Sequence, residues 1–306
     1  MTANTAIVLI HGHGPKPEPS ALLSLWRGAL AAGLRRDRPK LLQAFEAAEL
    51  SLVYYADLFE PPAANAVDPQ LDLADRQRAL EQLAALDKPK RFKRSSYEAL
   101  PGKSSFREFL ADVGSPVARG LGLGARAVTR WLPECGPYWQ KDGVYAKACG
   151  ARLRAELLPR LQAGQRVLLI AHGFGAVVAW DELWRFSREA LLSPEQRLHS
   201  WLTLGAPLAD DGVRRRLAGA SERGVARYPA CLTYWYNVAA EDDYVCHDET
   251  MANDFRAMLD QRLLSCIEDY LIYNLAVRFG RSNPHSSLGY LIHPKVTGLL
   301  ADWLER

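Results

Sequence analysis

Three positions in the sequence have the residue type and the local context from which chemistry can be built. Gly173 lies in the run His172-Gly173-Phe174-Gly175, between five consecutive apolar residues and a helix-like segment. Asp243 follows a strand-like segment, and His285 lies in a polar loop near the C-terminus. A carboxylate that orients an imidazole is a proton-transfer unit, so these two residues predict general acid–base chemistry. Gly173, in contrast, has no side chain that could react.

The residues around Gly173 are typical of a sharp reversal between a buried strand and a helix. The preceding run, Val167 to Ala171, reads as a buried strand of a parallel sheet. Where the backbone is strained to positive φ, glycine adopts it without steric cost. Ala171 and Gly175 leave room for close packing of the strand against the helix. The alternative is an ordinary glycine-containing turn, which is common in α/β proteins.

A second glycine-rich turn stands near the N-terminus. The apolar run Ala6–Ile10 ends in His11-Gly12-His13-Gly14, and glycines in such a loop let backbone N–H groups turn toward a negatively charged oxygen. The alternative, a phosphate-binding turn, is disfavoured because neither a G-x-G-x-x-G pattern nor a P-loop lysine follows.

These motifs together resemble the α/β-hydrolase superfamily, of serine esterase or lipase type. The resemblance covers nearly the whole chain: the HG-x-G loop, the G-x-S-x-G-like elbow, the strand end Gly205–Leu208, the Asp243 turn and the His285 loop. Uncharacterised bacterial members look similar in the first loop and in residues Tyr54–Leu58. In the family the residue after His172 is the nucleophilic serine, and here it is glycine.

The resemblance implies a role for each site residue. Gly173 occupies the nucleophile position, Asp243 is the acid and His285 is the base, in the chain order that the family uses. The backbone N–H groups of His13, or a neighbour in its loop, and of Phe174 would form the oxyanion hole. A covalent serine mechanism is closed with Gly173. No cofactor and no metal are expected.

Several neighbouring residues compete for these roles. Asp242 is the immediate rival of Asp243, and Glu241 is a weaker one; both could equally belong to a solvated acidic turn. His293 precedes a proline at a helix start and reads as structural. Other side chains that we do not assign to the catalytic base or nucleophile are His247, His11, Ser286, Ser287 and Cys246.

Strand-like segments alternate with helical stretches along the whole chain. This alternation predicts an α/β fold with one doubly wound, mostly parallel sheet and a single domain, residues 1–306. Ser20 is a plausible N-cap for the first helix. The predicted strands are Ala6–Ile10, Leu50–Tyr55, Val167–Ala171, Leu198–Leu204, Cys231–Val238 and Glu268–Asn274, and the later helices are Tyr145–Leu161 and Lys295–Glu305.

The pattern changes between about residues 61 and 150. Charged helix-like and glycine-broken apolar stretches predict a helical insertion that covers the active-site edge as a lid, with peripheral helices as the alternative. Within it, Lys88–Arg94 is a basic run that reads as a solvated loop; an anionic lipid or nucleic acid partner is a minority interpretation.

Composition and charge limit the kinds of partner and the cellular location that we expect for this chain. The chain has 306 residues and a formal net charge of +3, which argues weakly against nucleic acid as the main partner. The N-terminal apolar run is too short for a signal peptide, and nothing approaches a membrane-spanning length. Five scattered cysteines predict thiols in a reducing cytoplasm. The oligomeric state is not predicted.

Three functions fit these observations. The first is an esterase- or lipase-like hydrolase that is inactive or strongly impaired because its nucleophile is replaced. The second is a natural pseudoenzyme that binds a small acyl or lipid-like ligand, or a protein partner, in the same place. The third is a residual hydrolase in which His285 activates water.

Overall fold

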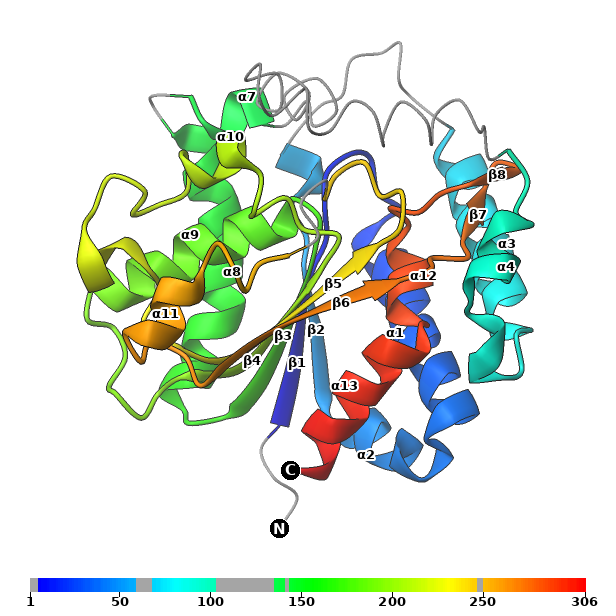
Figure 1. The fold of residues 1–306 in the computed structure, drawn as a ribbon, viewed down its shortest axis with the longest axis horizontal. Coiled ribbons are helices and arrows are strands. Elements are labelled where there is room, and N and C mark those ends of the chain that lie inside the picture. The colour runs from blue at the N-terminus through cyan, green and yellow to red at the C-terminus, as the bar shows by residue number, and fades with distance from the viewer. Residues whose placement is uncertain (1–4, 59–67, 103–134, 141–142, 247–249) are drawn as a thin grey trace.

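The central element is a six-stranded parallel sheet (Figure 1). The structure is a computed structural model and describes residues 5–58, 68–102, 135–140, 143–246 and 250–306. In the order in which they lie side by side, the strands are β2 (Glu49–Val53), β1 (Thr5–Ile10), β3 (Arg166–His172), β4 (Leu198–Leu204), β5 (Leu232–Ala240) and β6 (Cys266–Ile272).

The central strands are apolar because both faces of the sheet are covered. Ala6 to Ile10 of β1 are fully buried, and so are almost all residues of β3. A strand that is buried on both sides shows a continuous apolar run rather than an alternating one. The edge strand β6 is mixed instead: Ile267 and Ile272 are buried, Glu268 and Leu271 are exposed, and its other residues are half-buried.

Helices cover each face of the sheet. One face packs against α8 (Val144–Gln162) and α9 (Gly175–Arg188), and the other against α1 (Pro19–Asp37), α12 (Ser287–Leu291) and α13 (Pro294–Glu305). The other labelled elements are α2 (Leu42–Ala47), α3 (Pro69–Ala84), α4 (Arg94–Glu98), α7 (Cys135–Tyr138), α10 (Asp211–Arg214), α11 (Arg256–Asp260) and the hairpin of β7 (Val277–Arg278) and β8 (Arg281–Ser282).

The parallel sheet with helices on both faces confirms the predicted α/β class. One local prediction is wrong: Ser20 does not cap the first helix. The helix begins at Pro19 with Glu18 at the N-cap, and no side chain caps it. Proline is well suited to the first helical position because its fixed φ is helical. Its lack of an N–H costs nothing there, since an N–H at that position would have no partner within the helix.

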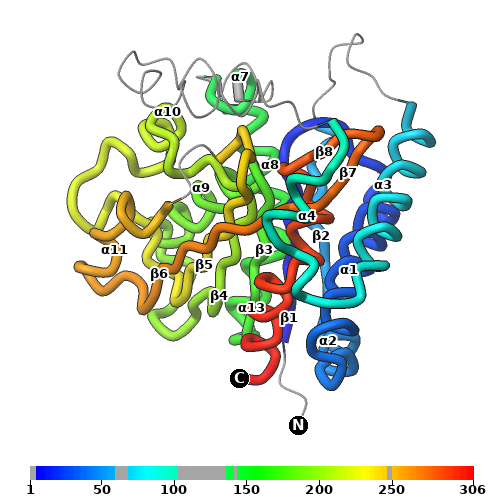
Figure 2. Tube along the Cα trace, turned by 45° about the vertical axis from the view of Figure 1, so that its right-hand side comes forward, coloured from blue at the N-terminus to red at the C-terminus, as the bar shows by residue number. Residues whose placement is uncertain are grey.

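The predicted insertion, about residues 61–150, includes α3, which lies beside α1, and α7, which lies beside the elbow residue Phe174. Helix α3 packs along α1 on the far side of that helix from the sheet (Figure 2), with Ala79 and Leu83 in the same hydrophobic cluster as α1. This placement follows from the apolar residues of α3, which complete a helix–helix contact. The glycine-broken stretch of the predicted lid, residues 106–132, lies outside the described residues.

The basic run is solvent-exposed, except for one aromatic anchor. Lys88 to Arg94 form a short 3-10 turn and the start of α4, and their cationic side chains are exposed. Phe92 is buried beneath the guanidinium of Arg36, which lies 4.5 Å from its ring centre. Within the described part of the chain, no helix is both long enough and apolar enough to cross a membrane.

Candidate functional site

The turn after β3 brings Gly173 to the carboxyl edge of the sheet. Gly173 has φ +53°, in the left-handed region, and its N–H donates to the carbonyl of Leu204 at 2.8 Å. Helix α9 then starts at Gly175, where a side-chain carbon would overlap the backbone carbonyl of His11. Glycine is thus required at these two positions for different reasons. Gly173 allows the left-handed turn, and Gly175 allows the helix to approach the end of β1.

Two strands further along the sheet, the loop after β5 carries a buried carboxylate. Asp243 is 4% exposed, and its two oxygens lie 3.0 and 2.9 Å from Nδ1 of His285, which is 7% exposed. Its Oδ2 also accepts the hydroxyl of Tyr290 at 2.6 Å, and its Oδ1 accepts the N–H of Val245 at 3.0 Å. Burial alone would raise the pKa of Asp243, but the imidazole and these hydrogen bonds outweigh it and hold the pKa below its ordinary value.

The imidazole of His285 points its other nitrogen at Gly173. Because Nδ1 donates to the carboxylate, Nε2 of the neutral ring is an acceptor. It is buried and has no hydrogen-bond partner among the described residues. A side-chain carbon on Gly173 would lie 3.0 Å from Nε2 and 3.1 Å from Cε1. The side-chain direction at position 173 therefore leads directly to the basic nitrogen.

The neighbouring acid has a different partner. Asp242 has φ +59°, and its carboxylate accepts the hydroxyl of Tyr97 at 2.8 Å. His293 caps α13, where its ring accepts the N–H of Lys295 at 3.1 Å, in agreement with a structural role. His247 lies outside the described residues.

The glycine-rich loop after β1 lies against the elbow. A side-chain carbon on Gly12 would be 2.9 Å from Nδ1 of His172 and 3.5 Å from the Cα of Gly173. The ring of His13 stacks on that of His285, with centres 5.3 Å apart. The two predicted oxyanion donors, the backbone N–H groups of His13 and Phe174, have no acceptor among the described residues.

The sequence did not predict the residues that hold the His285 loop and the Asp243 turn in place. His172 donates from Nε2 to the backbone carbonyl of His285 at 2.9 Å, so the last residue of β3 holds the histidine loop. Burial, followed by the nearby His285 and Lys16, lowers the pKa of His172 well below its ordinary value and keeps the ring neutral. Tyr290 could have been suspected only from its place five residues after His285.

Helix α7 covers one side of the elbow. The ring of Tyr138 meets that of Phe174 edge-on, with centres 4.9 Å apart, and its hydroxyl donates to the buried Asp181 of α9 at 3.0 Å. Asp181 also accepts the N–H of Ala218 at 2.7 Å. Burial raises the pKa of Asp181 to about 6. This contact ties α7 to the helix that starts at the elbow.

No group of three or more His, Cys, Asp or Glu side chains is arranged to hold a metal ion in the described part of the chain.

A comparison with protein-family models finds no matching family, and a search of curated proteins finds no match.

Proposed function

We propose that this chain is an α/β-hydrolase of the serine esterase or lipase type, whose nucleophile position is Gly173. One observation carries the proposal. The side-chain direction at Gly173 leads to Nε2 of His285 at 3.0 Å, while Nδ1 of the same ring is held by Asp243. An acid, a histidine and a strand-to-helix turn in this geometry are the frame of a catalytic triad.

The chemistry of this frame is acyl transfer. A hydroxyl on residue 173 would attack an ester, thioester or amide carbonyl, and His285 would take its proton. Asp243 would support the imidazolium that forms. The N–H groups of His13 and Phe174 would stabilise the oxyanion. Without a nucleophile the acyl-enzyme cannot form, so the protein is inactive or strongly impaired as an esterase.

The test is to supply the missing group. Gly173→Ser should react with a fluorophosphonate probe and hydrolyse a short-chain ester, whereas the protein itself should take no label at this position. Gly173→Ala is the matched control, because it adds the same carbon without the hydroxyl. Adding His285→Ala to Gly173→Ser should abolish labelling.

The same substitution should cost stability. A non-glycine residue in left-handed backbone costs about 1–3 kcal/mol, while the lower entropy of the unfolded chain returns only about 0.4–1 kcal/mol. The His285 ring must also move by a few tenths of an ångström, because the new carbon would lie 3.0 Å from Nε2. Gly173→Ser should therefore melt at a lower temperature than the parent protein.

The alternative is a natural pseudoenzyme that binds a small acyl or lipid-like ligand, or a protein partner, in the same site. A folded Gly173→Ser protein that takes no label and hydrolyses no ester would favour this alternative over a replaced nucleophile. The melt distinguishes that outcome from simple misfolding.

A further inference from the structure

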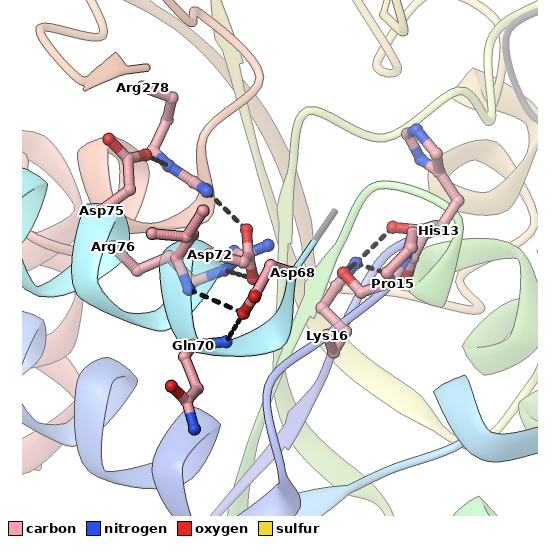
Figure 3. Close-up of polar contacts among 11 residues, drawn as sticks. His13, Pro15, Lys16, Asp68, Gln70, Asp72, Asp75, Arg76 and Arg278 are labelled. Carbon is pink, nitrogen blue, oxygen red and sulfur yellow. Dashed lines mark hydrogen bonds and ion pairs between the residues drawn. The ribbon is translucent and has the colours of Figure 1, made fainter. Parts of the chain in front are cut away.

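Every backbone carbonyl in the loop from His11 to Gly14 has a side-chain donor. The carbonyl of His11 accepts the hydroxyl of Tyr55 at 2.7 Å, and that of Gly12 lies 2.7 Å from Nδ1 of His11. The ammonium of Lys16 donates to the carbonyls of His13 and Gly14, the latter at 2.9 Å. Figure 3 shows the Lys16 side chain turned back toward its own loop. A side-chain contact therefore fixes the direction of each carbonyl in this loop.

The state of the His11 ring is fixed by its two contacts. Its Nε2 accepts the backbone N–H of Tyr55 at 2.9 Å, so the hydrogen of the neutral ring lies on Nδ1 and is donated to Gly12. Burial, with the charge of Lys16 second, lowers the pKa of His11 to about 3. The ring therefore stays neutral at ordinary pH and joins the loop to the residues that follow β2.

Fixing a carbonyl fixes the N–H that follows it. A trans peptide is planar, with its C=O and the next N–H pointing in opposite directions. The carbonyl of Gly12 points to the His11 ring, so the N–H of His13 points away from that ring. The peptide after His13 is held in the same way by Lys16. The predicted oxyanion donor is thus anchored on both sides, by His11 before it and Lys16 after it.

We propose that Lys16 is a positioning residue for the oxyanion loop: its ammonium holds the carbonyls of His13 and Gly14, which sets the direction of the Gly14 N–H and fixes the backbone that follows the His13 N–H, the group that the loop offers to a negatively charged oxygen. The inference rests on the proposed function. Gly14 assists with φ +79°, a left-handed conformation. The ammonium also brings a positive charge to the loop and, after burial and His285, contributes to the low pKa of His13.

The first test uses the protein with Gly173 and needs no catalysis. Amide hydrogen exchange is measured by NMR for the parent, Lys16→Met and Lys16→Arg. Without the two charge-assisted hydrogen bonds to its carbonyls the loop should open more often, so amide exchange at His13 and Gly14 should become faster on the order of tenfold or more in Lys16→Met, with the amides of β1 unchanged. Lys16→Arg should restore most of the protection. Lys90→Met, at an exposed lysine, is the matched control and should change nothing.

The second test adds Gly173→Ser and follows labelling by a fluorophosphonate at increasing concentrations. A misplaced donor impairs the transition state rather than probe binding, so Lys16→Met should lower the maximal labelling rate about tenfold to a hundredfold. The half-saturating concentration should stay the same, and Lys90→Met should label like the Gly173→Ser parent.

The outcomes of these experiments distinguish a failure of the proposed function from a failure of the role assigned to Lys16. If Gly173→Ser takes no label, the proposed function fails, and the exchange experiment alone decides whether Lys16 fixes the loop. If Gly173→Ser labels and Lys16→Met changes neither exchange nor labelling rate, the role of Lys16 is overturned. Equal slowing by Lys90→Met would also overturn it, because the effect would then be one of general charge.

Discussion

Tyr290 donates its hydroxyl at 2.6 Å to Oδ2 of Asp243, the same oxygen that lies 2.9 Å from Nδ1 of His285. The other oxygen of the carboxylate accepts the N–H of Val245. A buried carboxylate stays ionised only when such donors compensate its lost hydration. The tyrosine is therefore part of what keeps Asp243 charged beside the imidazole.

Tyr290→Phe should raise the pKa of Asp243 and lower the free energy of unfolding by about 1.5–3 kcal/mol at pH 7, the usual size for a hydrogen bond to a charged group. Because the folded-state pKa of Asp243 is depressed, its contribution is present above the unfolded value of about 3.9 and is lost as the pH falls below it. Urea unfolding from pH 7 down to pH 3 measures both effects: the variant should be less stable at pH 7 and should lose less stability on acidification, because its folded-state pKa lies nearer the unfolded value.

Tyr270→Phe is the control, because that hydroxyl meets the exposed Glu268 on the edge strand. Its effect should stay within about 0.5 kcal/mol, as for most surface changes. Equal losses in the two variants would show that the hydroxyl of Tyr290 has no special role.

Gly205→Ala should break the contact between acid and base. Gly205 has φ +56°, and a side-chain carbon there would lie 2.7 Å from Oδ2 of Asp243 and 3.1 Å from Nδ1 of His285. Overpacking together with left-handed strain should cost roughly 2–4 kcal/mol in denaturant unfolding. Gly298→Ala in α13 is the opposite case: nothing lies within 4 Å, so it should stabilise the protein by about 1 kcal/mol. The prediction is wrong if Gly205→Ala leaves stability unchanged.

Asp181→Asn should remove a pH dependence. Burial raises the pKa of Asp181 from 3.8 to about 6, so the folded protein holds this proton more tightly than the unfolded chain does. The ionised form therefore costs stability that the protonated form does not, on the order of 3 kcal/mol once the pH has risen from about 4 through 6. Asparagine can still accept the N–H of Ala218 with its Oδ1, and the hydroxyl of Tyr138 can rotate to accept from its amide NH2 group. Relative to the parent, the variant should gain stability across this range; a difference that does not vary with pH would contradict the assignment.

Arg278→Met should loosen α3 from the hairpin that precedes the His285 loop. Arg278 donates to Asp72 at 2.7 Å and to Asp75 (Figure 3). Asp75 also accepts the N–H of Phe279 at 3.0 Å. All three ionic side chains are largely buried, and removing one partner leaves uncompensated charge that costs about 3–5 kcal/mol. Limited proteolysis should cut near α3 sooner in the variant.

The control is Arg94→Met, which breaks an exposed pair with Glu98 and should leave the proteolysis pattern unchanged. If Arg278→Met is as resistant as the parent, the ion cluster does not hold α3.

The sequence predicts the strands well because a strand buried on both faces must be apolar throughout. Leu198–Leu204 coincides with β4, and the other predicted strands differ from the observed ones by at most a few residues at either end. It could not rank Asp243 against Asp242 with certainty, since adjacent acids differ only in the direction that the turn gives them. The left-handed φ of Asp242 directs that carboxylate to Tyr97 instead.

Contacts between distant segments were the part that sequence patterns did not reveal. The bonds from Tyr55 to His11 and from His172 to His285 join loops that only the sheet order brings together. The placement of α3 is a similar case, because its amphipathic pattern fits a helix surface as well as it fits a lid.

The bond from His172 to the carbonyl of His285 bears on how this chain can change over evolutionary time. It connects the end of β3 to the histidine loop through a ring that precedes position 173 and does not depend on the side chain there. Asp243, Tyr290 and His285 likewise support one another without a nucleophile. Purifying selection for a well-folded protein would therefore preserve the acid and the histidine even in a lineage that had lost turnover. The contact between Asp243 and His285 beside Gly173 is thus explained by stability alone, and adding a hydroxyl at position 173 is the measurement that separates a stable scaffold from a catalyst one codon away.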